Sequence, residues 1–397
     1  MSIGSPFHPR TAPLNRKQQW REWSGYLAAS AYEDSFVHEY TAIREAAALI
    51  DVSPLYKYRV AGPGALSLVD RVITRDARKL GLGSVWYTPW CDEAGKVVDD
   101  GTVARLDDTT YRWTAAEPQL RWLRMNATGL DVELEELSER VAAVAVQGPL
   151  SRAVLEAASG ASFADLRFFR RREAVVAGIP IDVSRTGYTG DLGYELWVEA
   201  DAAPDLWAAL ETAGRPFGLR AAGMLALDVV RIEAGFILLD IDYTSSRAAM
   251  TPDQAYSPGE IGLGRLVDLS KREFVGRRAL LAERDAGGPR RRLVGLALDW
   301  LDVERLHAAQ GLPPTVAAAA SRVPVPLYGP GGHQVGRATS TTWSPLLKQL
   351  IALASVEAGL AAPGTRLTVE WTVEAHRGRV GATVVELPFF DPPRKRA

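Results

Sequence analysis

Apolar and polar residues alternate along several short stretches of this chain, most clearly along 194–199, YELWVE. This period of two is typical of a strand with one face toward a core. On that pattern Glu195 lies on the face opposite Tyr194 and beside Trp197. Similar runs predict strands over 56–61, 111–116 and 132–137, and a hairpin over 85–106 whose turn is 92–95.

Other stretches carry apolar residues at helical spacing. Residues 32–50 combine this spacing with many alanines, which predicts a helix there. Further helices are expected over 117–128, over 203–213 and from Ser151, whose hydroxyl is available as a cap. From Leu293 onward, short β-type runs alternate with Gly/Pro turns, which predicts a small β-barrel or sandwich.

Length and charge narrow the classes of protein. A chain of 397 residues is expected to form two or three domains. With 46 Lys plus Arg against 48 Asp plus Glu, the net charge is -2, which does not favour binding to nucleic acid or to a membrane.

The single Cys91 excludes internal disulfides, and the spacing of the five scattered histidines predicts no metal site. The first residues lack the apolar run of a signal peptide, and no segment is apolar enough to span a bilayer, so we expect a cytoplasmic protein.

The stretch 184–199, SRTGYTGDLGYELWVE, gathers polar chemistry around three glycines. Gly187, Gly190 and Gly193 allow backbone conformations that other residues resist, so the chain can turn sharply and approach a ligand closely. The polar side chains between and after them are those of Tyr188, Thr189, Asp191 and Glu195. A carboxylate beside a large ring suits a flat, nitrogen-rich heterocycle. The alternative is a surface hairpin with solvated acids.

A second acidic feature is the pair Asp99 and Asp100, which interrupts a β-branched strand. Successive residues of a strand point to opposite faces, so one of these carboxylates faces inward unless the strand bulges there. An inward carboxylate is costly without a partner or a chemical task. The alternative interpretation is a turn at the end of the strand, just before Gly101.

These motifs resemble those of a known family. TGYTGDLGYEL is similar to the TGYTG-x-x-G-[YF]-E signature of the aminomethyltransferase family, which comprises the glycine-cleavage T-protein and its folate-dependent relatives. GKVVDDGTVARL is similar to the family's G-[GK]-x-[ILV]-D-D element. Further likenesses follow in the family's order: IDVSPLYKYRVAG, VAAVAVQGP, RIEAG, FVGRRAL and RATSTTWSP.

The resemblance implies an α+β fold of three domains in a ring around a central hole that holds tetrahydrofolate, with a small C-terminal β-barrel as the last domain. We expect a discontinuous first domain, a second domain inserted in it, a connecting region and the barrel domain. Their expected limits are 1–50 with 140–240, 51–139, 241–290 and 291–397.

The resemblance also implies roles for individual residues. Glu195 would grip the amine and amide edge of the pterin ring, with Tyr188 and Tyr87 packing or hydrogen bonding nearby. One of the paired aspartates would be the acid close to the folate nitrogens where the one-carbon unit is exchanged. We favour Asp99 for this role, with Asp100 as the alternative.

Two further positions are open to two interpretations. Arg231 is either a cofactor-binding residue that pairs with a carboxylate or part of a structural ion pair with Glu233 or Asp228. Trp343 stands in RATSTTWSP, where an aromatic ring can approach the central cavity, although most tryptophans pack in cores.

The implied activity is transfer of a methylene or methyl group from a small donor to tetrahydrofolate as co-substrate, with neither flavin nor metal. Two departures from the T-protein pattern leave the donor open: Leu227 replaces an arginine, and the region 236–266 is longer. One alternative is an O- or N-demethylase of a methoxylated or methylated-amine compound. Another, from a different class, is a non-catalytic folate-binding or structural member of a complex. The expected partner is a separate oxidoreductase or a lipoyl carrier protein.

Overall fold

The structure is a computed structural model that describes residues 2–397. The chain forms two compact units, each built from separate pieces of the sequence. Unit 1 comprises the chain up to Trp90, Asp99–Leu227 and Asp391–Ala397. Unit 2 comprises Cys91–Val98 and Asp228–Phe390.

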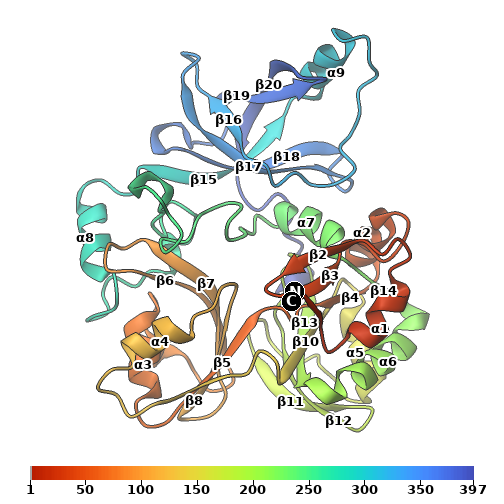
Figure 1. Cartoon of the computed structure of the whole chain (residues 1–397), viewed down its shortest axis with the longest axis vertical. Coiled ribbons are helices and arrows are strands. Elements are labelled where there is room, and N and C mark those ends of the chain that lie inside the picture. Colours follow the sequence, from red (N-terminus) through yellow and green to blue (C-terminus); the bar gives the residue numbers. More distant parts are fainter. Residues whose placement is uncertain (1) are drawn as a thin grey trace. The chain divides into compact units, whose positions relative to one another are not determined.

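Unit 1 contains a six-stranded sheet in the order β11-β12-β13-β10-β4-β14 (Figure 1). Its strands are β4 (Ala48–Asp51), β10 (Val141–Gln147), β11 (Arg171–Val176), β12 (Ile179–Ser184), β13 (Gly193–Glu199) and β14 (Arg220–Ala221). All neighbours pair antiparallel except β4 and β14, which are parallel. Helices α5 (Ser151–Ser159) and α6 (Ala203–Gly214) pack against each other and join the apolar core of this sheet.

The second sheet of unit 1 has five strands in the order β6-β7-β8-β5-β9. They are β5 (Tyr56–Ala61), β6 (Val85–Cys91), β7 (Val97–Arg105), β8 (Thr110–Ala115) and β9 (Glu133–Glu136). The tip of the β6–β7 hairpin, Cys91–Val98, is part of unit 2. The remaining elements of unit 1 are β1 (Ile3–Gly4), β2 (Trp20–Trp23), β3 (Tyr26–Ala29), α1 (His8–Thr11), α2 (Phe36–Glu45), α3 (Ala65–Val72) and α4 (Leu120–Asn126).

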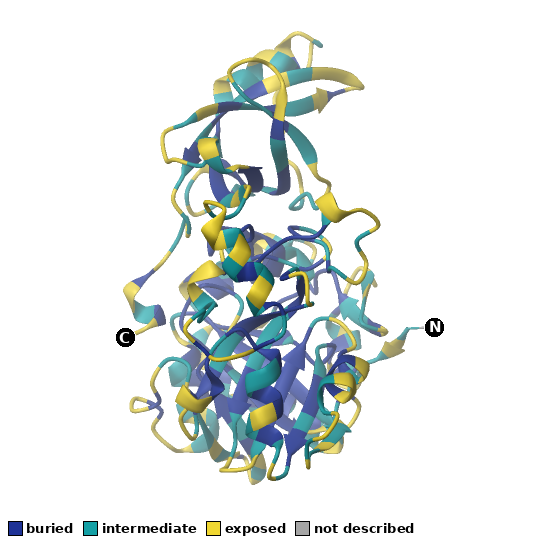
Figure 2. Ribbon diagram, turned by 90° about the vertical axis from the view of Figure 1, so that its left-hand side faces the viewer, coloured by how far each residue is buried: buried dark blue, intermediate teal, exposed yellow. Residues whose placement is uncertain are grey.

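Unit 2 is built around a closed barrel in the order β15-β18-β17-β16-β19-β20, drawn mainly in blue in Figure 1. Its strands are β15 (Arg291–Leu298), β16 (Val325–Tyr328), β17 (Gln334–Ser344), β18 (Gln349–Glu357), β19 (Arg366–Val373) and β20 (His376–Val385). Helix α7 (Met224–Glu233) begins in unit 1 and ends in unit 2, and helices α8 (Arg277–Asp285) and α9 (Trp300–Ala308) belong to unit 2. Figure 2 shows that buried residues follow the strands while most exposed residues lie on helices and loops.

The α+β class and the closing barrel are confirmed, and the strands expected over 56–61 and 194–199 form as β5 and β13. The helix expected over 32–50 is too long. Helix α2 ends at Glu45, and the residues after it form strand β4, which pairs with β10. Sheet pairing outweighs the helical propensity of these alanine-rich residues because the strand places them in the middle of a core.

The helix expected from Ser151 forms as α5, but the serine hydroxyl does not cap it. Its Oγ donates instead to the backbone oxygen of Leu192 at 3.3 Å. Leu192 belongs to residues 185–192, which connect β12 to β13 and which we call the signature loop. The hydroxyl therefore ties α5 to this loop.

The predicted domain limits divide the chain differently from the two compact units. Most of the expected first and second domains lies together in unit 1. The expected connecting region, 241–290, shares unit 2 with the barrel. The last residues, Asp391–Ala397, return to unit 1.

The glycines of the signature act mainly through close packing. Of the three, only Gly190 has a positive φ, 73°. A Cβ on Gly187 or Gly193 would lie 2.1 Å or 2.3 Å from the side-chain amide of Gln147. This amide is fully buried and hydrogen bonded through both its nitrogen and its oxygen, so it has no room to move. The close approach expected from the sequence is thus made to the protein's own glutamine.

We therefore expect Gly193→Ala to lower the free energy of unfolding by about 3 kcal/mol, because the new methyl group must displace a buried, hydrogen-bonded amide. Urea unfolding followed by circular dichroism measures the change. The control is Gly359→Ala, where an added Cβ meets nothing within 4 Å, and its unfolding midpoint should stay close to that of the wild type. Equal stability of the Gly193 variant and the wild type would contradict the packing role.

Candidate active site

The residues that the sequence singled out divide between the two units. Unit 1 carries Tyr87, Asp99, Asp100, Tyr188 and Glu195, and unit 2 carries Arg231 and Trp343. The residues in unit 1 come from three strands, β6, β7 and β13, and from the signature loop. The two sets are therefore described separately.

Asp99 points into the interior of unit 1 and is fully buried. Its carboxylate accepts hydrogen bonds from the backbone N–H of Asp100 at 2.7 Å and of Glu117 at 3.0 Å, and from the side-chain amide of Gln119 at 3.1 Å. Burial raises the pKa of Asp99 well above its usual value, and the charge of Asp100 adds to that rise. Its oxygens already serve three donors that hold the strand in place, which favours the alternative, Asp100, as the reactive acid; the role of either aspartate stays a prediction.

Asp100 takes the other face of β7 and is only half-buried. Its carboxylate accepts a hydrogen bond of 2.6 Å from the phenol of Tyr87 on β6. Burial raises the pKa of Tyr87 well above its usual value, and the Asp100 charge and the nearby phenol of Tyr188 add to the effect. Tyr87 therefore stays a proton donor, and the structure brings Asp100, Tyr87 and Tyr188 together.

Glu195 lies on β13, and its side chain is half-buried on the face opposite Tyr194. Within the described part of the chain, one side-chain hydrogen bond reaches its carboxylate, donated by the hydroxyl of Thr186. Burial raises the pKa of Glu195, while the Thr186 hydroxyl and then the positive charge of Arg112 act in the opposite direction. Because a carboxylate has about four acceptor positions, Glu195 keeps capacity for further donors.

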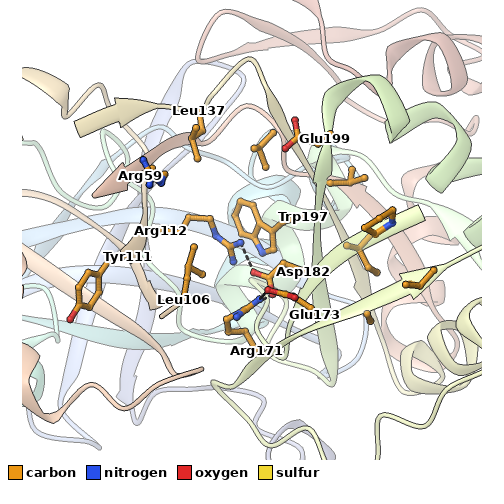
Figure 3. A pocket seen from close by; sticks show the side chains of 16 residues that line it. Arg59, Leu106, Tyr111, Arg112, Leu137, Arg171, Glu173, Asp182, Trp197 and Glu199 are labelled. Atoms are coloured by element: carbon orange, nitrogen blue, oxygen red, sulfur yellow. Dashed lines mark hydrogen bonds and ion pairs between the residues drawn. The ribbon is translucent and has the colours of Figure 1, made fainter. Parts of the chain in front are cut away.

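Arg112 is a functional candidate that sequence reasoning missed. It lies on β8, is buried, and its guanidinium stacks 4.2 Å from the centre of the Trp197 ring. It pairs with Asp182 on β12, and Asp182 also accepts a 2.6 Å hydrogen bond from Arg171 (Figure 3). The only signal in the sequence is an arginine within the apolar run of β8, in YRWTA, where an inward charge needs a partner.

These three charged side chains also line a pocket of about 620 Å³ between strands of the two sheets, which Figure 3 shows from close by. None of the seven predicted residues is among the sixteen described residues that line it. Within it, Asp182 forms ion pairs with both Arg112 and Arg171. We therefore place the candidate chemistry at Asp100 and Glu195, and regard the pocket, which Trp197 helps to line, as a separate neighbouring cavity.

Arg231 has the geometry of a structural ion pair within unit 2. It is almost fully buried, and its guanidinium donates to Asp242 at 2.6 Å and to the hydroxyl of Ser340 at 2.8 Å. Asp242 is thus the nearest carboxylate partner, and the sequence analysis did not name it. Asp228 lies 3.8 Å from Arg231 and accepts a shorter, 2.8 Å contact from Arg322.

Trp343 lies on β17 and is half-buried. Its ring packs edge-on against Trp300 of α9, with 5.5 Å between the ring centroids. In unit 2 the tryptophan thus packs at the margin of the barrel core.

Residues 2–397 contain neither a metal-binding cluster nor a membrane-spanning helix. In this range no three His, Cys, Asp or Glu side chains gather as they would around a metal ion. No helix in the same range has the length and apolar character needed to cross a bilayer.

Comparison with known proteins gives a consistent result. The model of the GCVT N-terminal domain matches residues 9–271, and that of the glycine cleavage T-protein C-terminal barrel domain matches residues 291–391. The crystal structure of the glycine cleavage system aminomethyltransferase T from Bartonella henselae has a TM-score of 0.83 at 23% identity. That likeness covers 98% of this chain and 99% of the other and shows the shared fold.

The sequence relatives extend along nearly the whole chain. The aminomethyltransferase of Moorella thermoacetica is 37% identical over 379 residues, which is 94% of each chain. The trimethylamine-oxide aldolase of Ruegeria pomeroyi is 33% identical over 414 residues, which is 100% of this chain and 48% of that protein. Both domain models and these relatives agree, and the chain belongs to the glycine cleavage T-protein family of aminomethyltransferases.

Proposed function

We propose that this protein transfers a one-carbon group from a small donor to tetrahydrofolate, which binds in unit 1 as co-substrate. The observation that carries the proposal is the grouping of Asp100, Tyr87 and Tyr188, with Glu195 on the signature strand. Membership of a family of aminomethyltransferases supports the class of reaction.

The residues of the site fit the polar edge of a pterin. Glu195 is a half-buried carboxylate with acceptor positions to spare, and an amine and amide edge presents N–H donors to such a group. Arg112, held by Asp182 and stacked on Trp197, keeps a positive charge close enough to favour the ionised form of Glu195. Two tyrosine rings, Tyr87 and Tyr188, offer flat surfaces and hydroxyls nearby.

Asp100 is the proposed acid–base and charge-stabilising group. The hydrogen bond from Tyr87 fixes its orientation, and its half-buried position allows contact with a reacting nitrogen. A carboxylate placed there stabilises positive charge at the transferred carbon and can accept or return the proton of the attacking nitrogen. Tetrahydrofolate supplies the accepting nitrogen, and the protein orients it.

Two classes of donor remain in the proposal. Relatives named aminomethyltransferases favour an aminomethyl group carried by a lipoyl protein. A relative that matches the full chain is named trimethylamine-oxide aldolase, which favours a methylated amine. Leu227, where the family has an arginine, is buried in the structure, so this position carries no charge for a donor. We take the one-carbon transfer to tetrahydrofolate as the common activity and the methylated amine as the alternative donor.

The first test is calorimetric titration with tetrahydrofolate. Wild-type protein should bind, and Glu195→Gln should weaken the affinity at least about tenfold, or roughly 1.4 kcal/mol, because the charged acceptor of the pterin edge is lost. Glu199→Gln is a matched control on the same strand, since Glu199 is exposed and should leave the affinity unchanged. If wild type shows no binding, the folate proposal is wrong.

The affinity for tetrahydrofolate should also depend on pH. The pKa of Glu195 lies above its usual value of 4.5, so the carboxylate is lost as pH falls through that raised pKa, and affinity falls with it. Arg112→Met removes a charge that lowers this pKa, so the loss should begin at higher pH. Glu195→Gln corrects for protonation of the ligand itself. An unchanged pH profile in Arg112→Met would show that the arginine does not act on Glu195.

The two aspartates should separate in paired measurements of stability and transfer. Asp100→Asn should fold normally, bind tetrahydrofolate and lose about 10²-fold or more in transfer rate, because the ionised group at the reacting nitrogen is gone. Asp99→Ala should lower the free energy of unfolding by about 3 kcal/mol, because three N–H donors lose their acceptor.

The transfer is measured as formation of methylenetetrahydrofolate from an aminomethylated lipoyl protein and, in parallel, of methyltetrahydrofolate from methylated amines. A fully active Asp100→Asn protein, together with a stable but inactive Asp99→Asn protein, would reverse the assignment of the two residues.

A further inference from the structure

Asp191 belongs to the signature loop, yet the proposed reaction does not use it. Its side chain is fully buried and accepts a 2.8 Å hydrogen bond from the backbone N–H of Leu192. Arg394 donates to both carboxylate oxygens, from Nε at 2.7 Å and from Nη2 at 2.8 Å. Arg44 is more distant, with 3.7 Å between the charged atoms. Because a buried carboxylate is costly without donors, Asp191 depends mainly on the two-point contact from Arg394.

Arg394 belongs to residues 391–397, which we call the closing segment. This segment is part of unit 1, although residues 228–390 before it belong to unit 2. Arg185 of the signature loop is buried, and it donates to backbone oxygens of the segment at Arg394, Lys395 and Ala397. The loop therefore binds the segment through one guanidinium and receives another guanidinium from it.

The same contacts fix the backbone on both sides of Gly190, within the signature loop. Arg44 donates from Nη1 to the backbone oxygen of Thr189 at 2.9 Å. Arg394 donates in turn to the backbone oxygen of Arg44 at 3.4 Å. Tyr188 immediately precedes Thr189, so the position of its ring depends on how firmly this stretch of backbone is held.

We propose that the closing segment acts as a clamp that positions Tyr188, through the contact of Arg394 with the buried carboxylate of Asp191. Arg394 is thus a positioning residue that acts on the site from a part of the chain far away in sequence. The effect on ligand binding rests on the proposed function, because it takes Tyr188 to border tetrahydrofolate.

The clamp differs from an ordinary structural anchor in what its loss changes. An anchor stabilises the whole unit, whereas a clamp determines the order of one loop. Arg394→Gln tests this, since its side chain is 41% exposed and its removal leaves no buried cation behind. Arg396→Gln is the matched control, because Arg396 lies two residues away, is more than half exposed and pairs with Asp391 of its own segment.

Hydrogen–deuterium exchange of peptides covering 186–192 is the first readout. In Arg394→Gln, the amides of these residues should exchange about tenfold faster than in the control, because loop opening no longer breaks the ion pair. The melting temperature should fall as well, because the buried Asp191 loses its main partner. The exchange of 186–192 is therefore compared with that of peptides from β10, which should change much less if Arg394 acts on the loop. Arg394→Lys keeps the positive charge but cannot donate to both carboxylate oxygens as the planar guanidinium does, so the exchange rate of 186–192 in this variant should be intermediate. Unchanged exchange in Arg394→Gln would overturn the clamp.

Tetrahydrofolate titration on the same variants is the second readout. Arg394→Gln should bind about tenfold more weakly than the control. In a Tyr188→Ala background, the same change should cost much less, because the clamp has nothing left to position. An equal loss in both backgrounds would show that Arg394 acts by another route, and the positioning role would be wrong.

The two proposals fail in different ways. If wild-type protein does not bind tetrahydrofolate, the proposed function is lost, while the exchange of 186–192 still decides whether the closing segment orders the loop. If wild type binds and Arg394→Gln binds equally well, the function stands and the clamp is wrong.

Discussion

Successive side chains of a β-strand point to opposite faces, and this constraint sorts the acids of the site. On β7 it sends Asp99 into the core and leaves Asp100 half-buried beside Tyr87. On β13 it places Glu195 opposite Tyr194, which packs in the core of the six-stranded sheet. A shift of either strand by one residue would exchange these roles, so the register of the two sheets defines the site.

Hydrogen bonding then separates supporting acids from available ones. Asp99, Asp182 and Asp191 are inward-facing carboxylates that each have several donors, and each joins segments that are distant in sequence. Glu195 differs because it is half-buried and retains acceptor positions. Supporting acids reduce the cost of their own burial through neighbours, whereas an available acid leaves part of that cost to be offset by a ligand.

The sequence predicted β5 and β13 because both are short runs of β-type residues, although Lys57 and Trp197 on their second faces are buried as well. Local periodicity failed after Glu45, where pairing of β4 with β10, nearly a hundred residues later, decides the structure. Alternation also showed that Asp99 and Asp100 must point to opposite faces of the strand. Which of them points inward depends on the donors at Glu117 and Gln119, 18 and 20 residues later.

Pairs of charged residues were the least predictable part of the site. Arg231 was expected either to bind cofactor or to pair with Glu233 or Asp228. Asp228 lies at 3.8 Å, but the shorter contact, 2.6 Å, is with Asp242, 11 residues along the chain. Arg112 pairs with Asp182 across 70 residues and two different sheets. Neither partner is marked by spacing or composition, because a long flexible arginine can reach many carboxylates and only the tertiary fold selects one.

The packing of the signature glycines has a consequence for inferring the function of related proteins from their sequences. Gly187 and Gly193 close over the buried amide of Gln147, so the fold itself requires them. A relative that had lost its reactive carboxylates would still need these glycines in order to fold. The glycine pattern therefore reports a shared scaffold, whereas the acids at positions 100 and 195 report whether that scaffold still carries the chemistry.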